Sequence, residues 1–185
     1  MPRSTPDELT AIPDVHTFIL RVQILNVADM STQTETHPLI TGIAQVKLPV
    51  TDLPRSVSWY CEVLDLRHWI EFVEEGEVCG AGLIDRSGAF NIALRLRQRC
   101  AGHPVLTGFD VVAFTPSSRF ALDVLAGRCS RLGVTHSGIA DGPEGSRLDI
   151  PDPDGTVLRF YHFTAPTTGF TTVEATPEGM VASTV

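Results

Sequence analysis

The feature of this sequence that most constrains its fold is an internal repeat between Gly42 and Phe163. In each half, a strand-like run is followed by a helical pattern and then by three further strand-like runs, separated by glycine and polar residues. Self-similarity of this kind indicates two copies of one supersecondary unit. We therefore predict an α+β fold of two βαβββ modules, the first over residues 43–100 and the second over residues 107–163.

Each predicted helix carries boundary signals of its own. In the first half, Asp52 precedes an apolar stripe and Pro54 falls in the first turn, which is typical of a helix N-terminus. In the second half, either Ser117 or Ser118 can cap the helix, and Gly133 follows its last turn. These signals place one helix after the first strand of each module.

The composition excludes several classes of protein. The chain has 185 residues, of which 43% are hydrophobic and 19% are charged, as in an ordinary globular domain. Its net charge of −8 argues against a nucleic-acid-binding protein, which normally carries a basic surface. The longest early apolar run, over residues 16–27, is too short for a membrane span and is interrupted by Arg21 and Gln23. We therefore expect neither a nucleic-acid partner nor a membrane partner.

The cysteines favour a reducing compartment. The four of them form no CxxC pair and no cluster with zinc-finger spacing, so we expect four reduced and mostly buried thiols. This usage fits a cytoplasmic protein better than a secreted one. The cysteines are Cys61, Cys79, Cys100 and Cys129.

The two ends of the chain differ from the repeat. Residues 1–40 are predicted to be an N-terminal extension, for which two interpretations remain open. Either Met30 is the natural start, or the alternating residues 18–24 form an added strand on the domain. Residues 41–163 are the predicted two-module domain. Residues 164–185 are rich in Thr, Pro, Gly and Ala without periodicity, so we expect a flexible tail.

Two motifs carry a family resemblance. The run VKLPVTDLPRSVSWYCEVLDL, and DPDGTVLRFY about a hundred residues later, resemble the vicinal oxygen chelate superfamily. This group includes glyoxalase I, bleomycin-resistance and fosfomycin-resistance proteins, and extradiol dioxygenases. The resemblance implies that the two modules pack their curved sheets into a cup that holds a small ligand, with the helices outside. It also implies a homodimer, and it leaves open whether the cup closes within one chain or across the dimer.

Many members of this superfamily bind a divalent metal at four positions in the cup. Here these positions correspond to Gln45, Ala93, Asp110 and Arg159, with Val111 in place of Asp110 if the register shifts by one residue. Ala93 offers no donor atom, and Arg159 is a permanent cation without an acceptor. We therefore predict a member that holds no metal and no other cofactor.

Cations are expected in the cup instead. Strand alternation places Lys47 on the same face as Gln45, and it places Arg95 on the cup side of its own strand. Together with Arg159, these residues would bind a carboxylate or phosphate of a ligand. The alternative is that Arg159 pairs with Asp110, which would neutralise both groups.

The remaining candidates are residues expected to contact the ligand or to take part in catalysis. The residues expected to bind ligand are Gln45, Lys47, Trp69, Arg95, Val112 and Phe114. The candidate catalytic residues are Asp110 and Tyr161 as acid or base, with Arg159 as electrostatic stabiliser. We predict metal-independent binding of an anionic or carbonyl-bearing metabolite, with lyase, isomerase or cyclase activity. The alternatives are a non-catalytic drug-binding resistance protein and a metal-dependent glyoxalase-like lyase or dioxygenase.

Overall fold

The computed structural model describes residues 40–164, 166, 168, 171–176 and 179–183. The predicted N-terminal extension, with its added strand and the possible start at Met30, therefore lies almost entirely outside the described residues. The chain from Gly42 onward forms one compact unit, which contains both halves of the repeat.

The first module is a four-stranded sheet with one helix. In space the strands follow the order β1-β4-β3-β2, with β1 parallel to β4 and the other neighbours antiparallel. A short 3₁₀ turn follows the last strand. In chain order the elements are β1 (Val46–Val50), α1 (Leu53–Leu64), β2 (Arg67–Glu74), β3 (Glu77–Ile84), β4 (Asn91–Leu96) and the turn η3 (Arg97–Arg99).

The second module repeats this topology. Its strands follow the order β5-β8-β7-β6, again with the first strand parallel to the last. The prediction of two βαβββ modules is therefore confirmed. The elements are β5 (Asp110–Phe114), α2 (Arg119–Leu132), β6 (Ala140–Gly142), β7 (Gly145–Pro151) and β8 (Val157–Phe163).

The predicted helix boundaries are present. The Asp52 carboxylate accepts a hydrogen bond of 3.0 Å from the backbone N–H of Arg55. Of the two candidate caps of the second helix, Ser118 is the one used, since its hydroxyl accepts from the N–H of Ala121. Gly133 ends α2 in the left-handed region, with φ of +68°.

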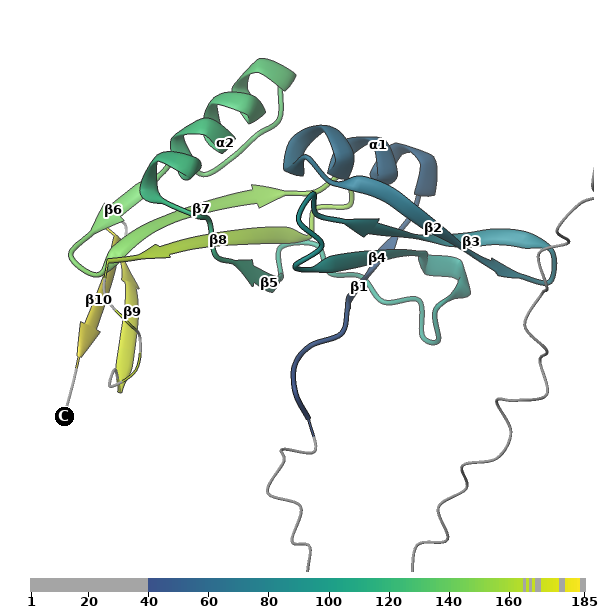
Figure 1. The fold of residues 1–185 in the computed structure, drawn as a ribbon, viewed down its shortest axis with the longest axis horizontal. Coiled ribbons are helices and arrows are strands. Elements are labelled where there is room, and N and C mark those ends of the chain that lie inside the picture. Colours follow the sequence, from purple (N-terminus) through teal and green to yellow (C-terminus); the bar gives the residue numbers. More distant parts are fainter. Residues whose placement is uncertain (1–39, 165, 167, 169–170, 177–178, 184–185) are drawn as a thin grey trace, which may run out of the picture. The chain divides into compact units, whose positions relative to one another are not determined.

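Both helices pack on one side of the sheets. Figure 1 shows α1 and α2 on the same side, where α1 contacts β3 and β4, α2 contacts β7 and β8, and the helices contact each other. Alternate strand residues are buried under the helices, and the residues between them face away. One apolar core therefore runs through both modules. Its fully buried side chains include Leu48, Tyr60, Leu83, Leu122, Leu148 and Leu158.

The segment after Thr164 contains regular structure that was not expected. An antiparallel hairpin joins β9 (Thr172–Thr176) to β10 (Gly179–Ser183), and β10 contacts β6 and β7. The sequence did not predict these strands, because Thr and Val, which favour strands, are mixed with Pro and Gly and show no alternation of apolar and polar residues. The flexibility of this segment stays a prediction. In the part of the chain that the structure describes, no helix is long and apolar enough to span a membrane.

The D-P-D-G turn before β8 links the second module to the first. The buried Asp152 carboxylate accepts a hydrogen bond of 2.9 Å from the hydroxyl of Tyr60 in α1, and it also accepts from the backbone N–H of Asp154 and of Thr156. The Asp154 carboxylate accepts from the N–H and, at 2.6 Å, from the hydroxyl of Thr51. The turn thus acts as a hydrogen-bonded clasp between the modules, made by Thr51, Tyr60, Asp152 and Asp154.

This clasp predicts a loss of stability at alkaline pH. Burial, and then the neighbouring charge of Asp152, raises the pKa of Tyr60 far above its ordinary value. Above about pH 10 the unfolded chain releases the tyrosine proton while the folded chain keeps it, so the free energy of unfolding falls by up to about 1.4 kcal/mol per pH unit. Urea unfolding at increasing pH should show a shallower decline in Tyr60→Phe. The control is Tyr161→Phe, and an equal decline in wild type and Tyr60→Phe contradicts the prediction.

Candidate functional site

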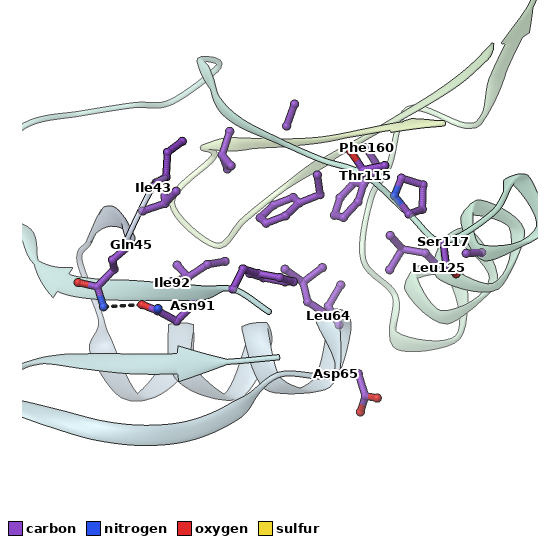
Figure 2. Close-up of a pocket in the computed structure, with 18 of the residues that line it drawn as sticks. Ile43, Gln45, Leu64, Asp65, Asn91, Ile92, Thr115, Ser117, Leu125 and Phe160 are labelled. Carbon is purple, nitrogen blue, oxygen red and sulfur yellow. Dashed lines mark hydrogen bonds between the residues drawn. The ribbon is translucent and has the colours of Figure 1, made fainter. Parts of the chain in front are cut away.

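A cavity of about 810 Å³ lies between the two modules. It is lined by residues of β1, α1, β4, β5, α2 and β8, so both halves of the repeat contribute to it. Its volume falls within the range of about 300 to 1,000 Å³ that is usual for small-molecule sites. Figure 2 shows the side chains that surround it.

Phenylalanine rings form much of the cavity wall. The rings of Phe114 and Phe160 are nearly parallel, with centroids 5.2 Å apart and an interplanar angle of 24°. Phe90 packs against Phe114 at 5.5 Å in a tilted arrangement. Val112 and Leu125 extend this apolar surface. The wall therefore suits the apolar body of an organic ligand.

One end of the cavity carries a fixed pair of amides. The Gln45 side chain donates a hydrogen bond of 2.7 Å to the Asn91 side-chain oxygen, and Asn91 donates one of 3.0 Å to the backbone carbonyl of Ala44. Figure 2 shows Gln45 and Asn91 at one end of the cavity, with Ser117 and Leu125 at the other. The amide pair is held in place before any ligand arrives and offers polar atoms to it.

Charged groups lie elsewhere along the lining. Arg128 of α2 donates a hydrogen bond of 3.3 Å to the backbone carbonyl of Val63. Asp65 forms two hydrogen bonds of 2.7 Å with Arg86. These bonds with Arg86 lower the pKa of the Asp65 carboxyl, and the charge of Arg128 adds a smaller contribution. The Asp65 carboxylate is thus already paired, whereas Arg128 bonds to a neutral carbonyl.

The structure separates the residues that the sequence analysis placed in one cup. Gln45, Val112 and Phe114 line the cavity. The other predicted site residues do not line it and are Lys47, Trp69, Arg95, Asp110, Arg159 and Tyr161.

A β-bulge in β5 explains most of this separation. Asp110 pairs with Val157, but Val112 pairs with Leu158, because the register shifts by one residue between them. Asp110 therefore shares the sheet face of Arg159, opposite the helices, whereas Val112 turns to the side of the buried Leu158. The expectation that Asp110 and Val112 contribute to one concave surface is corrected by this bulge.

Arg159 lies in a network of ion pairs on the face away from the helices. It forms two hydrogen bonds with Asp149, of 2.8 and 3.1 Å, and a further one with Asp110. Its guanidinium carbon lies 5.8 Å from the centroid of the Tyr161 ring. The hydrogen bonds with Asp149 raise the pKa of Arg159, so it stays charged. The alternative of an Arg159–Asp110 pair is confirmed, and Asp149 was missed.

The other predicted cations do not form a free cluster. Arg95 pairs with Glu74 at 2.5 Å and donates a further hydrogen bond of 3.1 Å to the carbonyl of Arg99. Lys47 is exposed, and Trp69 has 56% of its surface exposed. Of the anion-binding group expected from Lys47, Arg95 and Arg159, the two arginines are therefore paired with neighbouring carboxylates.

Comparisons with known proteins agree with this architecture. The family described as the Glyoxalase/Bleomycin resistance protein/Dioxygenase superfamily matches residues 42–160, which is more than half of the chain. The chain belongs to this superfamily. No curated protein matches it significantly.

Solved structures of the superfamily share the fold of this chain. A glyoxylase/bleomycin resistance protein/dioxygenase domain from Frankia sp. EAN1pec is 25% identical, with a TM-score of 0.56 over 67% of this chain and 93% of that one. TnmS3, an antibiotic binding protein from Streptomyces sp. CB03234, is 16% identical, with a TM-score of 0.58 over 69% of this chain and 100% of that one. Lactoylglutathione lyase from Agrobacterium tumefaciens is 18% identical, with a TM-score of 0.52 over 66% and 94%.

The four positions that hold a metal in many members of the superfamily do not fit one here. Ala93 is 2% exposed and has no donor atom, and the positive Arg159 is held in ion pairs with Asp149 and Asp110. The amide of Gln45 is bonded to Asn91. Among the described residues, no three His, Cys, Asp or Glu side chains gather in a group that would hold a metal ion.

Proposed function

We propose that this protein binds a small organic molecule in the cavity between its modules, without a metal. The observation that carries the proposal is a cavity of about 810 Å³ with an aromatic wall and a fixed pair of amides at one end. An apolar surface with a few converging polar groups is the usual composition of a small-molecule site. Structures with this fold include an antibiotic binding protein and a lyase, so the fold is compatible with binding and with catalysis.

A second candidate function is metal-independent catalysis on the sheet face opposite the helices. Arg159 lies beside both Asp110 and Tyr161, which supports the predicted catalytic trio. The ion pairs of Arg159 argue for a structural role instead, because the guanidinium donors already have carboxylate partners. The binding function is therefore preferred to the lyase, isomerase or cyclase activity.

The homodimer and the cytoplasmic location belong to the same proposal, and the four free thiols support a reducing compartment.

Binding to the cavity is testable with a neutral aromatic dye. N-phenylnaphthylamine should bind wild-type protein saturably and with increased fluorescence, in the presence of EDTA. Ala121 lines the cavity from α2, so Ala121→Trp fills part of the space and is expected to weaken binding at least about tenfold. Fluorescence titration measures the affinity.

The matched control is Ala101→Trp, which makes the same change at an exposed turn outside the cavity lining. It should leave the affinity unchanged, and circular dichroism verifies that both variants fold. Equal binding by wild type and Ala121→Trp would overturn the proposal, as would binding that EDTA abolishes. Conversion of a bound compound to product would favour the second candidate.

A further inference from the structure

The geometry points to an aromatic acid as the ligand class, with its rings on the phenylalanine wall and its anionic group on Arg128. This inference rests on the proposed function, since it concerns the same cavity. It moves the anion-binding role from Arg159, where the sequence suggested it, to a residue of α2.

Arg128 interrupts an apolar face of the helix. Ala121, Val124, Leu125 and Arg128 follow one another at i, i+3, i+4 and i+7, so they lie along one side of α2. All four line the cavity. A helix that serves only as core covering would continue this stripe with an apolar residue. The stripe instead places a half-buried guanidinium beside the cavity.

Among the described residues, the charge of Arg128 has no partner of opposite sign in contact, although it acts through space on the Asp65 carboxylate. No carboxylate of the described residues lies within ion-pair distance of it, and its hydrogen bond goes to the carbonyl of Val63 through one nitrogen. A guanidinium carries five N–H donors, so most of them remain for a ligand. The acidic lining residue Asp65 is bonded to Arg86 through both carboxylate oxygens. A partly buried cation in this state favours an incoming anion.

The wall beside this cation is suited to flat rings. Phe114 and Phe160 stack almost parallel, and Phe90 extends the group with 42% of its surface still exposed. Aromatic rings pack favourably against such surfaces in offset or edge-to-face arrangements. An aromatic acid would satisfy both features at once, whereas an aliphatic acid would use only the cation.

A pair of dyes tests the inference. Anilinonaphthalene sulfonate carries the ring system of N-phenylnaphthylamine plus one anionic group. Wild-type protein should bind the anionic dye at least about tenfold more tightly than the neutral dye, because charge-assisted hydrogen bonds are the stronger kind. Arg128→Gln should remove this preference, because it weakens the binding of the anionic dye at least about tenfold more than the binding of the neutral dye. The control Arg131→Gln changes a residue of α2 that does not line the cavity and should keep the preference.

The outcomes separate this inference from the proposed function. If the neutral dye binds and Ala121→Trp weakens it, but the anionic dye shows no preference or keeps it in Arg128→Gln, the cavity stands and the inference is overturned. If the anionic dye loses affinity equally in Arg128→Gln and Arg131→Gln, the attraction is a general effect of helix charge and the inference is again overturned. If neither dye responds to Ala121→Trp, the proposed function itself fails.

Discussion

Replacing Asp152 with alanine is expected to lower the free energy of unfolding by about 3 kcal/mol. The residue is 6% exposed, and its carboxylate accepts hydrogen bonds from the Tyr60 hydroxyl and from two backbone N–H groups of its own turn. The truncation leaves these donors without an acceptor in a buried place, and it cuts one of the two links of the clasp. Urea unfolding at neutral pH, followed by circular dichroism, measures the loss.

Variants of the same clasp make the prediction specific. Asp152→Asn keeps an oxygen that accepts from Tyr60, so it should lose less than the alanine variant. Tyr60→Phe removes one donor and should cost about 1 kcal/mol. The double variant Tyr60→Phe/Asp152→Ala should cost less than the sum of the two single variants, because the residues are in contact. Glu62→Ala, at an exposed position of α1, is the control, and an equal loss in Glu62→Ala and Asp152→Ala contradicts the prediction.

The fold was predictable because its signals are local. The cap of α1 at Asp52, the glycine after α2 and the alternation of β8 each depend on a few neighbouring residues. The repeat then supplied the topology, since a second copy of the same pattern indicates a second module. These signals predict which residues face a helix, but they do not predict how the two helices are positioned relative to each other.

The candidate site was less predictable because it depends on non-local geometry. The bulge in β5 adds one residue near Val111, and nothing in the run DVVAF signals it. The cavity requires the position of α2 beside the first module, which no periodicity provides. One contact of the site could have been predicted from the sequence, namely the pairing of Asp149 with Arg159. The D-P-D-G turn makes Pro151 pair with Val157, and counting two residues back along the hairpin places Asp149 opposite Arg159. The cation at the i+7 position of the α2 stripe was a second available signal.

Replacing Arg159 with methionine is expected to cost about 2 to 3 kcal/mol of folding free energy. The arginine side chain is 23% exposed and joins Asp149, 19% exposed, to Asp110 from a different strand. Its removal leaves the partly buried carboxylate of Asp149 and the exposed carboxylate of Asp110 without their main partner. Arg147, 3.7 Å from Asp149, compensates in part. Urea unfolding at neutral pH measures the effect, and restoration of stability in Arg159→Met/Asp149→Leu would show that the uncompensated charge is its cause.

The control for this prediction is an exposed ion pair of similar geometry. Arg86 also makes two hydrogen bonds with one carboxylate, but it is 68% exposed, so Arg86→Met should change stability little. A loss in Arg159→Met no larger than that in Arg86→Met would contradict the structural role.

Because Arg159 does not line the cavity, Arg159→Met should also bind N-phenylnaphthylamine with unchanged affinity. A stability loss without a binding loss would place Arg159 in the scaffold. The position that carries a metal ligand in many relatives would then hold an internal ion pair here, and ligand recognition would lie on the helix side of the sheets.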